Sequence, residues 1–128
     1  MTSNGCERTV LVVDDDEDVR NAIAEVLEDV NYRPLRAANG VAALEQLRAA
    51  MPRPCVILLD MMMPIMDGNE FRLRQQSDAE LKAIPVVVLS AHAEANRSAP
   101  QPDADAYLRK PVDLSELLRI VEQFCGKA

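Results

Sequence analysis

The stretch TVLVVDDDEDVR, residues 9–20, runs a short apolar segment directly into a cluster of acids. Wholly apolar runs of this length are typical of parallel strands that are covered on both faces. Three consecutive carboxylates, Asp14 to Asp16, follow this strand. Like charges at this spacing repel, and burying a carboxylate is costly unless a cation or hydrogen bonds compensate. The acids therefore lie at a solvated strand end, or they hold a metal ion.

Outward from this stretch, apolar runs alternate with amphipathic segments along the whole chain. Strands are predicted within residues 10–13, 32–39, 54–60, 84–91 and 106–111, and helices within 15–31, 40–50, 69–76 and 113–125. Pro34 suits an edge strand, and Asp113 or Ser115 can cap the last helix. Strands that alternate with helices predict an α/β fold with a doubly wound, five-stranded parallel sheet and right-handed crossovers.

The segment between the fourth and fifth strands departs from this rhythm. It reads AHAEANRSAPQPDAD over residues 91–105, and neither Pro100 nor Pro102 fits inside a helix. Any helix here is confined to about residues 93–98, which is under two turns. We therefore expect a short or irregular fourth helix.

Size and charge limit the classes of function. The 128 residues match one domain, 1–128, with a core from about 9 to 125. The net charge of −7 is repelled by phosphate backbones, which disfavours direct binding of nucleic acid. The polar N-terminal residues resemble no signal peptide, and no apolar run approaches the roughly 20 residues of a membrane helix. We expect a cytoplasmic protein without membrane insertion.

The three cysteines, Cys6, Cys55 and Cys125, are far apart and form no C-x-x-C motif. An odd number at such spacing argues against a disulfide framework and against a zinc site. The sequence predicts free thiols, as is usual in a reducing cytosol.

Chemistry-bearing residues follow four of the five predicted strands. Ligands of doubly wound sheets bind beyond the carboxyl ends of the strands, where the strand order reverses. A strand order of 2-1-3-4-5 places Asp14 and Asp15 beside Asp60, with Ser90 and Lys110 at the ends of the last two strands. We therefore expect three carboxylates, a hydroxyl and an ammonium group in one pocket.

This set of groups fits phosphoryl transfer. Carboxylate oxygens are the ligands that Mg²⁺, or Mn²⁺, prefers. A carboxylate that attacks a phosphoryl group forms an acyl phosphate, and the catalysis is mainly positioning and charge neutralisation. Asp60 is then the nucleophile, while Lys110 and Ser90 each contact a phosphoryl oxygen.

With these residues assembled, the chain resembles a response regulator receiver domain of two-component signalling. The matching segments are VLVVDD, VILLDMMMPIMDG, IPVVVLSA and AYLRKP, and they span essentially residues 9–125. The resemblance implies the flavodoxin-like receiver fold. It also implies a domain that catalyses only its own phosphorylation and dephosphorylation. The chain ends soon after its last predicted helix, which suggests a single-domain response regulator or a piece of a longer one.

The resemblance implies a role for each acid. Asp60 matches the phosphoacceptor and Asp15 the direct carboxylate ligand of Mg²⁺. Asp14 matches the acid that helps to hold the ion, commonly through water. Asp60 itself and the backbone carbonyl of Met62 match further ligands. Asp16 has no such counterpart, and we expect an exposed acid in the first helical turn.

The resemblance also implies the phosphoryl contacts and the switch. Ser90 matches the hydroxyl that moves toward the phosphoryl group, and the backbone amide of Ala91 matches a further phosphoryl contact. Lys110 matches the family's lysine, and the bond to Pro111 resembles the family's cis peptide. Tyr107 matches the switch aromatic, although a strand aromatic at this position can also be simply half-buried.

The implied partners are a histidine kinase or a histidine phosphotransfer protein as donor, and an unidentified protein downstream. Two other functions stay open. The D-x-D pattern within residues 14–17 also fits a phosphatase of the haloacid dehalogenase type, in which Asp14 is the nucleophile. The same fold also serves as a binding module that needs no phosphorylation. The identity of the phosphorylated residue separates the three.

Overall fold

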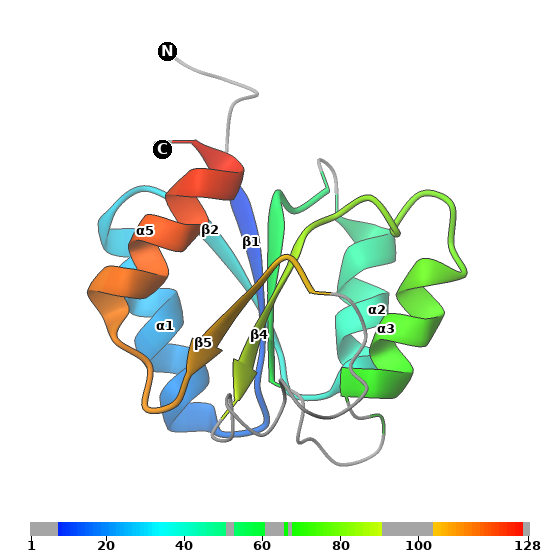
Figure 1. Ribbon diagram of the computed structural model, residues 1–128, viewed down its shortest axis with the longest axis horizontal. Helices are drawn as coiled ribbons and strands as arrows, with labels where there is room; N and C mark the ends of the chain where they lie inside the picture. Colours follow the sequence, from blue (N-terminus) through cyan, green and yellow to red (C-terminus); the bar gives the residue numbers. More distant parts are fainter. Residues whose placement is uncertain (1–7, 51–52, 61–65, 67, 91–103, 127–128) are drawn as a thin grey trace.

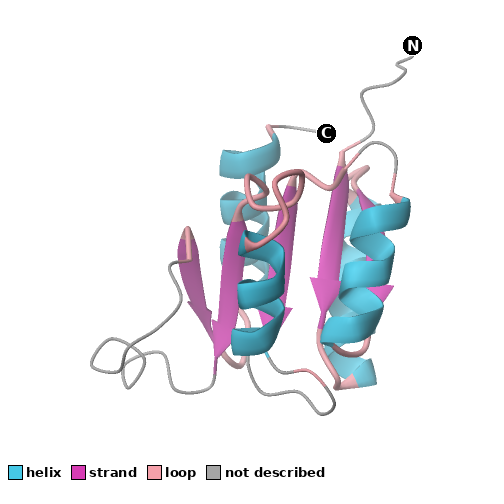
Figure 2. Cartoon of the chain, turned by 90° about the vertical axis from the view of Figure 1, so that its right-hand side faces the viewer, coloured by secondary structure: helices cyan, strands magenta, loops and turns pink. Residues whose placement is uncertain are grey.

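The structure is a computed structural model, and it describes residues 8–50, 53–60, 66, 68–90 and 104–126. Its centre is one sheet whose strands are all parallel, as the arrows in Figure 2 show. The strand order is β2-β1-β3-β4-β5, as predicted. The strands are β1 (Thr9–Val13), β2 (Arg33–Ala37), β3 (Val56–Asp60), β4 (Val86–Ser90) and β5 (Ala106–Arg109).

Helices cover both faces of this sheet (Figure 1). On one face lie α1 (Glu17–Asp29) and α5 (Leu114–Cys125), and on the other lie α2 (Gly40–Ala49) and α3 (Gly68–Gln76). This arrangement confirms the doubly wound α/β fold. The short helix expected within residues 93–98 lies outside the described residues.

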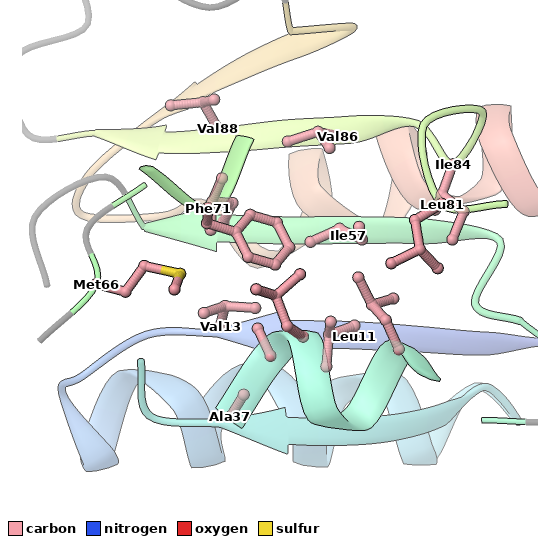
Figure 3. Close-up of a cluster of buried hydrophobic side chains, with 14 residues drawn as sticks. Leu11, Val13, Ala37, Ile57, Met66, Phe71, Leu81, Ile84, Val86 and Val88 are labelled. Atoms are coloured by element: carbon pink, nitrogen blue, oxygen red, sulfur yellow. The ribbon is translucent and has the colours of Figure 1, made fainter. Parts of the chain in front are cut away.

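Burial explains why the strands sit where they do. All residues of β1 and β3 are buried, because these strands are covered by helices on both sides. The residues of β2 are mostly exposed or half-buried, which fits its edge position and its proline, Pro34. Between the sheet and α2 and α3 lies an apolar cluster that includes Leu11, Ile57 and Phe71 (Figure 3).

Side chains at the helix starts satisfy free backbone N–H groups. Asp16 caps α1, because its carboxylate accepts hydrogen bonds from the amides of Asp18 and Val19. Its exposure was predicted, but it precedes the first turn and does not lie within it. Asp113 caps α5 in the same way, which decides between the two predicted caps.

The cysteine prediction is wrong for two of the three residues. Cys55 precedes β3 and Cys125 ends α5, and the structure joins them in a disulfide with a Cα–Cα distance of 5.4 Å. The two residues are 70 positions apart in the sequence, so their spacing gave no sign of the pairing. They meet because the start of β3 and the end of α5 lie at the same end of the sheet (Figure 1). The Cys55 sulfur also lies 3.2 Å from the Thr9 carbonyl oxygen. This contact is not a hydrogen bond, because a disulfide sulfur carries no proton.

Among the described residues, no helix combines the length and the apolar character that crossing a bilayer requires.

Candidate functional site

Acidic side chains gather where β1 and β3 end. Asp14 directly follows β1, and Asp60 is the last residue of β3. The two strands are paired in register, with Val13 opposite Leu59, so their carboxyl ends lie side by side. One carboxylate oxygen from each of Asp14, Asp15 and Asp60 lies within 4.8 Å of the other two. The structure thus brings together the three acids that the sequence predicted.

The three acids differ in their environment. Asp14 is fully buried and Asp60 is only 4% exposed, whereas Asp15 is exposed. Burial of two carboxylates at this distance is costly without compensating charge or hydrogen bonds. The site therefore needs cations close by, and Asp15 is the acid of the three that is open to solvent.

Backbone and side-chain contacts fix the orientation of Asp14. Its amide donates to the Ala37 carbonyl at 3.1 Å, and its Oδ1 accepts from the Asp16 amide at 2.9 Å. Arg20 of α1 donates from Nη1 to the Asp14 carbonyl at 2.8 Å. Sequence reasoning missed Arg20, whose only signal was a cation one helical turn beyond the acids.

Lys110 supplies a cation from the end of β5. Its Nζ lies 3.0 Å from Asp14 Oδ2 and 3.5 Å from Asp60 Oδ2, so one ammonium group bridges the two buried acids. Burial alone would lower the pKa of Lys110. The hydrogen bond and charge of Asp14, followed by those of Asp60, outweigh burial and raise the pKa above its ordinary value of 10.5. Lys110 is therefore charged at neutral pH.

The carboxylate oxygens of the site fit a divalent ion. Asp14 Oδ2 is buried, and among the described residues its partner is the ammonium group of Lys110, which it shares with Asp60. A buried carboxylate oxygen of this kind normally has a further partner. With the oxygens of Asp15 and Asp60 it offers the hard, anionic ligand set that suits Mg²⁺.

The other predicted site residues are described only in part. Ser90 ends β4 opposite Arg109, the residue before Lys110, so β4 reaches the same edge of the sheet. The Lys110–Pro111 peptide is cis, as the resemblance implied. Tyr107 is 43% exposed, which makes it less covered than an ordinary core aromatic. The predicted contacts of Met62 and Ala91 fall outside the described residues.

A groove of about 500 Å³ opens beside the acids. One wall comes from α1, through Val19, Ala22 and Ile23, and the other from the segment that begins at Lys110 and continues to Leu114. The groove is therefore mostly apolar, with Lys110 as its charged residue.

Comparisons with known proteins agree with this geometry. A family model of the response regulator receiver domain matches residues 10–122. Response regulator Rre1 of Synechocystis sp. is 33% identical over 122 aligned residues, covering 93% of this chain and 52% of that protein. This chain thus spans about half the length of Rre1.

Two solved structures are similar over nearly their whole length. Chemotaxis response regulator CheY4 of Vibrio cholerae has a TM-score of 0.82 and 29% identity, covering 92% of this chain and 98% of that one. The receiver domain of sensor histidine kinase PA1611 from Pseudomonas aeruginosa has a TM-score of 0.84 and 25% identity, covering 94% and 99%. That structure holds a magnesium ion coordinated in its active site cleft.

Proposed function

We propose that this chain, which belongs to the response regulator receiver domain family, is a phosphorylation-dependent signalling switch with Asp60 as its phosphoacceptor. The observation that carries the proposal is the pairing of Asp60 with Asp14 and Lys110 at one sheet edge. That set supplies a nucleophile, a cation for phosphoryl oxygens and ligands for a metal ion.

The proposed reaction transfers one phosphoryl group. A carboxylate oxygen of Asp60 forms a bond to phosphorus while the bond from phosphorus to the donor's histidine nitrogen breaks, and that nitrogen keeps the electron pair. Lys110 is already 3.5 Å from Asp60 and carries its proton, so it is placed to neutralise a phosphoryl oxygen. Asp14, Asp15 and the Met62 carbonyl would hold Mg²⁺, which supplies further neutralisation of charge on the phosphoryl oxygens.

Phosphorylation would change the contacts of two strands. Lys110 bridges Asp14 and Asp60 before transfer, and a dianionic phosphoryl group on Asp60 competes for the same ammonium group. We propose that Ser90 moves toward the phosphoryl group, whose oxygens Ser90 and the Ala91 amide contact, and that the exposed Tyr107 follows this movement. The resulting surface change alters the affinity for a downstream protein.

The apolar groove beside Lys110 is the proposed docking place for the donor. It combines aliphatic side chains of α1 with a lining that begins at the phosphoryl-binding lysine. A histidine kinase or histidine phosphotransfer protein that presents an apolar helix there brings its phosphohistidine to Asp60.

Phosphorylation with a small donor tests the proposal. Incubation with acetyl phosphate and Mg²⁺ should add one phosphoryl group to the chain, as seen by intact mass, and Asp60→Ala should remove the gain. Asp16→Asn is the matched control, since it changes an exposed neighbouring acid and keeps a capping side chain.

Two results would contradict the proposal. A phosphoryl group mapped to Asp14 favours a phosphatase of the haloacid dehalogenase type. No gain of mass in the wild-type chain favours a binding module that works without phosphorylation.

A further inference from the structure

The start of α2 contacts the connection that leads from Asp60 to α3. The backbone amide of Gly40, the first residue of α2, donates a hydrogen bond to the Met66 carbonyl at 3.1 Å. Met66 lies six positions after Asp60 and two before the start of α3. One of the free N–H groups at the start of α2 is thus satisfied by the backbone carbonyl of Met66.

The Met66 side chain is seated over the same glycine. It is only 7% exposed and belongs to the apolar cluster between the sheet and α2 and α3, toward which it points in Figure 3. A Cβ added at Gly40 would lie 2.6 Å from Met66 Cγ, 2.7 Å from Sδ and 2.8 Å from Cβ. These distances are too short for carbon, so a side chain at position 40 must displace Met66.

The same short segment also contacts the other half of the acid cluster. Ala37, at the end of β2, accepts the hydrogen bond from the Asp14 amide at 3.1 Å. Residues 37–40 therefore contact the backbone at Asp14 through Ala37, and Met66 through Gly40. We call this segment, residues 37–40, the brace.

We infer that Gly40 is a positioning residue for the acid cluster, because its lack of a side chain lets the brace seat Met66 while Ala37 of the same segment holds the backbone at Asp14. The inference rests on the proposed function, since it assigns the brace a part in metal binding and phosphoryl acceptance. Gly40 itself touches none of the acids and exchanges no atom in the reaction.

Helix propensity makes the opposite prediction, which gives the inference a clear test. Alanine is favoured over glycine in helices, so propensity alone predicts that Gly40→Ala is neutral or stabilising. If the brace positions the site, Gly40→Ala instead weakens Mg²⁺ binding by about tenfold, as is common for residues that orient metal ligands. Phosphorylation by acetyl phosphate slows in parallel.

Second substitutions at Met66 separate positioning from a general loss of stability. Met66→Gly removes all three close atoms, so Gly40→Ala should then leave the Mg²⁺ dissociation constant unchanged. Met66→Ala keeps Cβ and should give an intermediate effect of Gly40→Ala. Such dependence on the background is the signature of direct coupling between two residues. Val41→Ala, an exposed change one residue further along α2, is the matched control and should have no effect.

Each outcome decides the inference. An unchanged Mg²⁺ affinity in Gly40→Ala overturns it, and so does an equal loss in all three Met66 backgrounds. If the wild-type chain binds Mg²⁺ but takes no phosphoryl group, the proposed function fails while the Mg²⁺ affinities still decide the role of Gly40. A wild-type chain that binds no Mg²⁺ overturns both.

Discussion

At the scale of single residues, the central feature is one lysine that serves two buried acids. Lys110 Nζ lies 3.0 Å from Asp14 and 3.5 Å from Asp60, and these acids are the least exposed in the cluster. Without a metal ion, Lys110 is the nearest compensation for both charges among the described groups. A divalent ion at the same acids would share that task.

Lys110→Gln should therefore destabilise the protein far more without Mg²⁺ than with it. We expect a loss of about 2 kcal/mol in the free energy of unfolding without the ion, because two buried carboxylates lose their counter-charge. Urea denaturation with and without Mg²⁺ measures this difference. The exposed Lys82→Gln is the control and should be neutral in both conditions. Equal losses for Lys110→Gln in the two conditions would refute the shared role.

The pH dependence of this contribution has a definite sign. The folded-state pKa of Lys110 is raised above 10.5, so its stabilisation is complete at lower pH. The contribution is lost as the pH rises through the folded-state pKa. The stability difference between the wild type and Lys110→Gln should thus stay constant through neutral pH and shrink only above about pH 10.5. A stability difference that already shrinks between about pH 6 and about pH 9, where histidine and not lysine titrates, would contradict this assignment.

The residues of the site were predictable to the extent that strand ends determine them. Asp14, Asp15, Asp60 and Lys110 each lie at the end of a predicted strand, and parallel strands bring such ends to one edge. The contacts of Arg20, Ala37 and Gly40 could not be predicted, because they depend on the paths of the connections between elements. No periodicity in the sequence records those paths.

At the scale of elements, the end of α5 is held at two places. Cys125 is joined to Cys55, and the Tyr32 hydroxyl donates to the Gly126 carbonyl at 2.7 Å. Both contacts lie at the C-terminal end of an amphipathic helix whose buried residues include Leu117 and Val121. Sequence patterning located the helix, whereas the two attachments join residues far apart in the sequence and were not visible in it.

Reduction of the disulfide should lower the stability of the chain. Closing a loop of 70 residues stabilises by about 4 kcal/mol in the chain-entropy description, so the expected loss on adding dithiothreitol is of that size. Denaturation with and without the reductant measures it, and Cys55→Ser should make the chain insensitive to reductant. Thiol titration of the unreduced, unfolded chain should find one free thiol, Cys6. Three free thiols would show that the pair is not oxidised.

At the scale of the whole molecule, the fold places Asp14, Asp15, Asp60 and Lys110 at one end of the sheet. The order β2-β1-β3-β4-β5 sets the first and third strands side by side, and the acids of both strands meet there. The alternation of strands and helices predicted the parallel sheet, and strand number with right-handed crossovers limited its topology. The disulfide lies at the opposite end of β3 from Asp60, so the two features are separated by the length of that strand.

The central claim is that the acids of two neighbouring strands hold one divalent ion together and leave Asp60 able to accept a phosphoryl group. Calorimetric titration of Mg²⁺ into the metal-free chain tests it most directly. The account predicts one ion per chain at millimolar concentration or below, binding that is lost in Asp15→Asn and retained in Asp16→Asn. No binding at millimolar Mg²⁺, or binding that Asp15→Asn leaves unchanged, would contradict it.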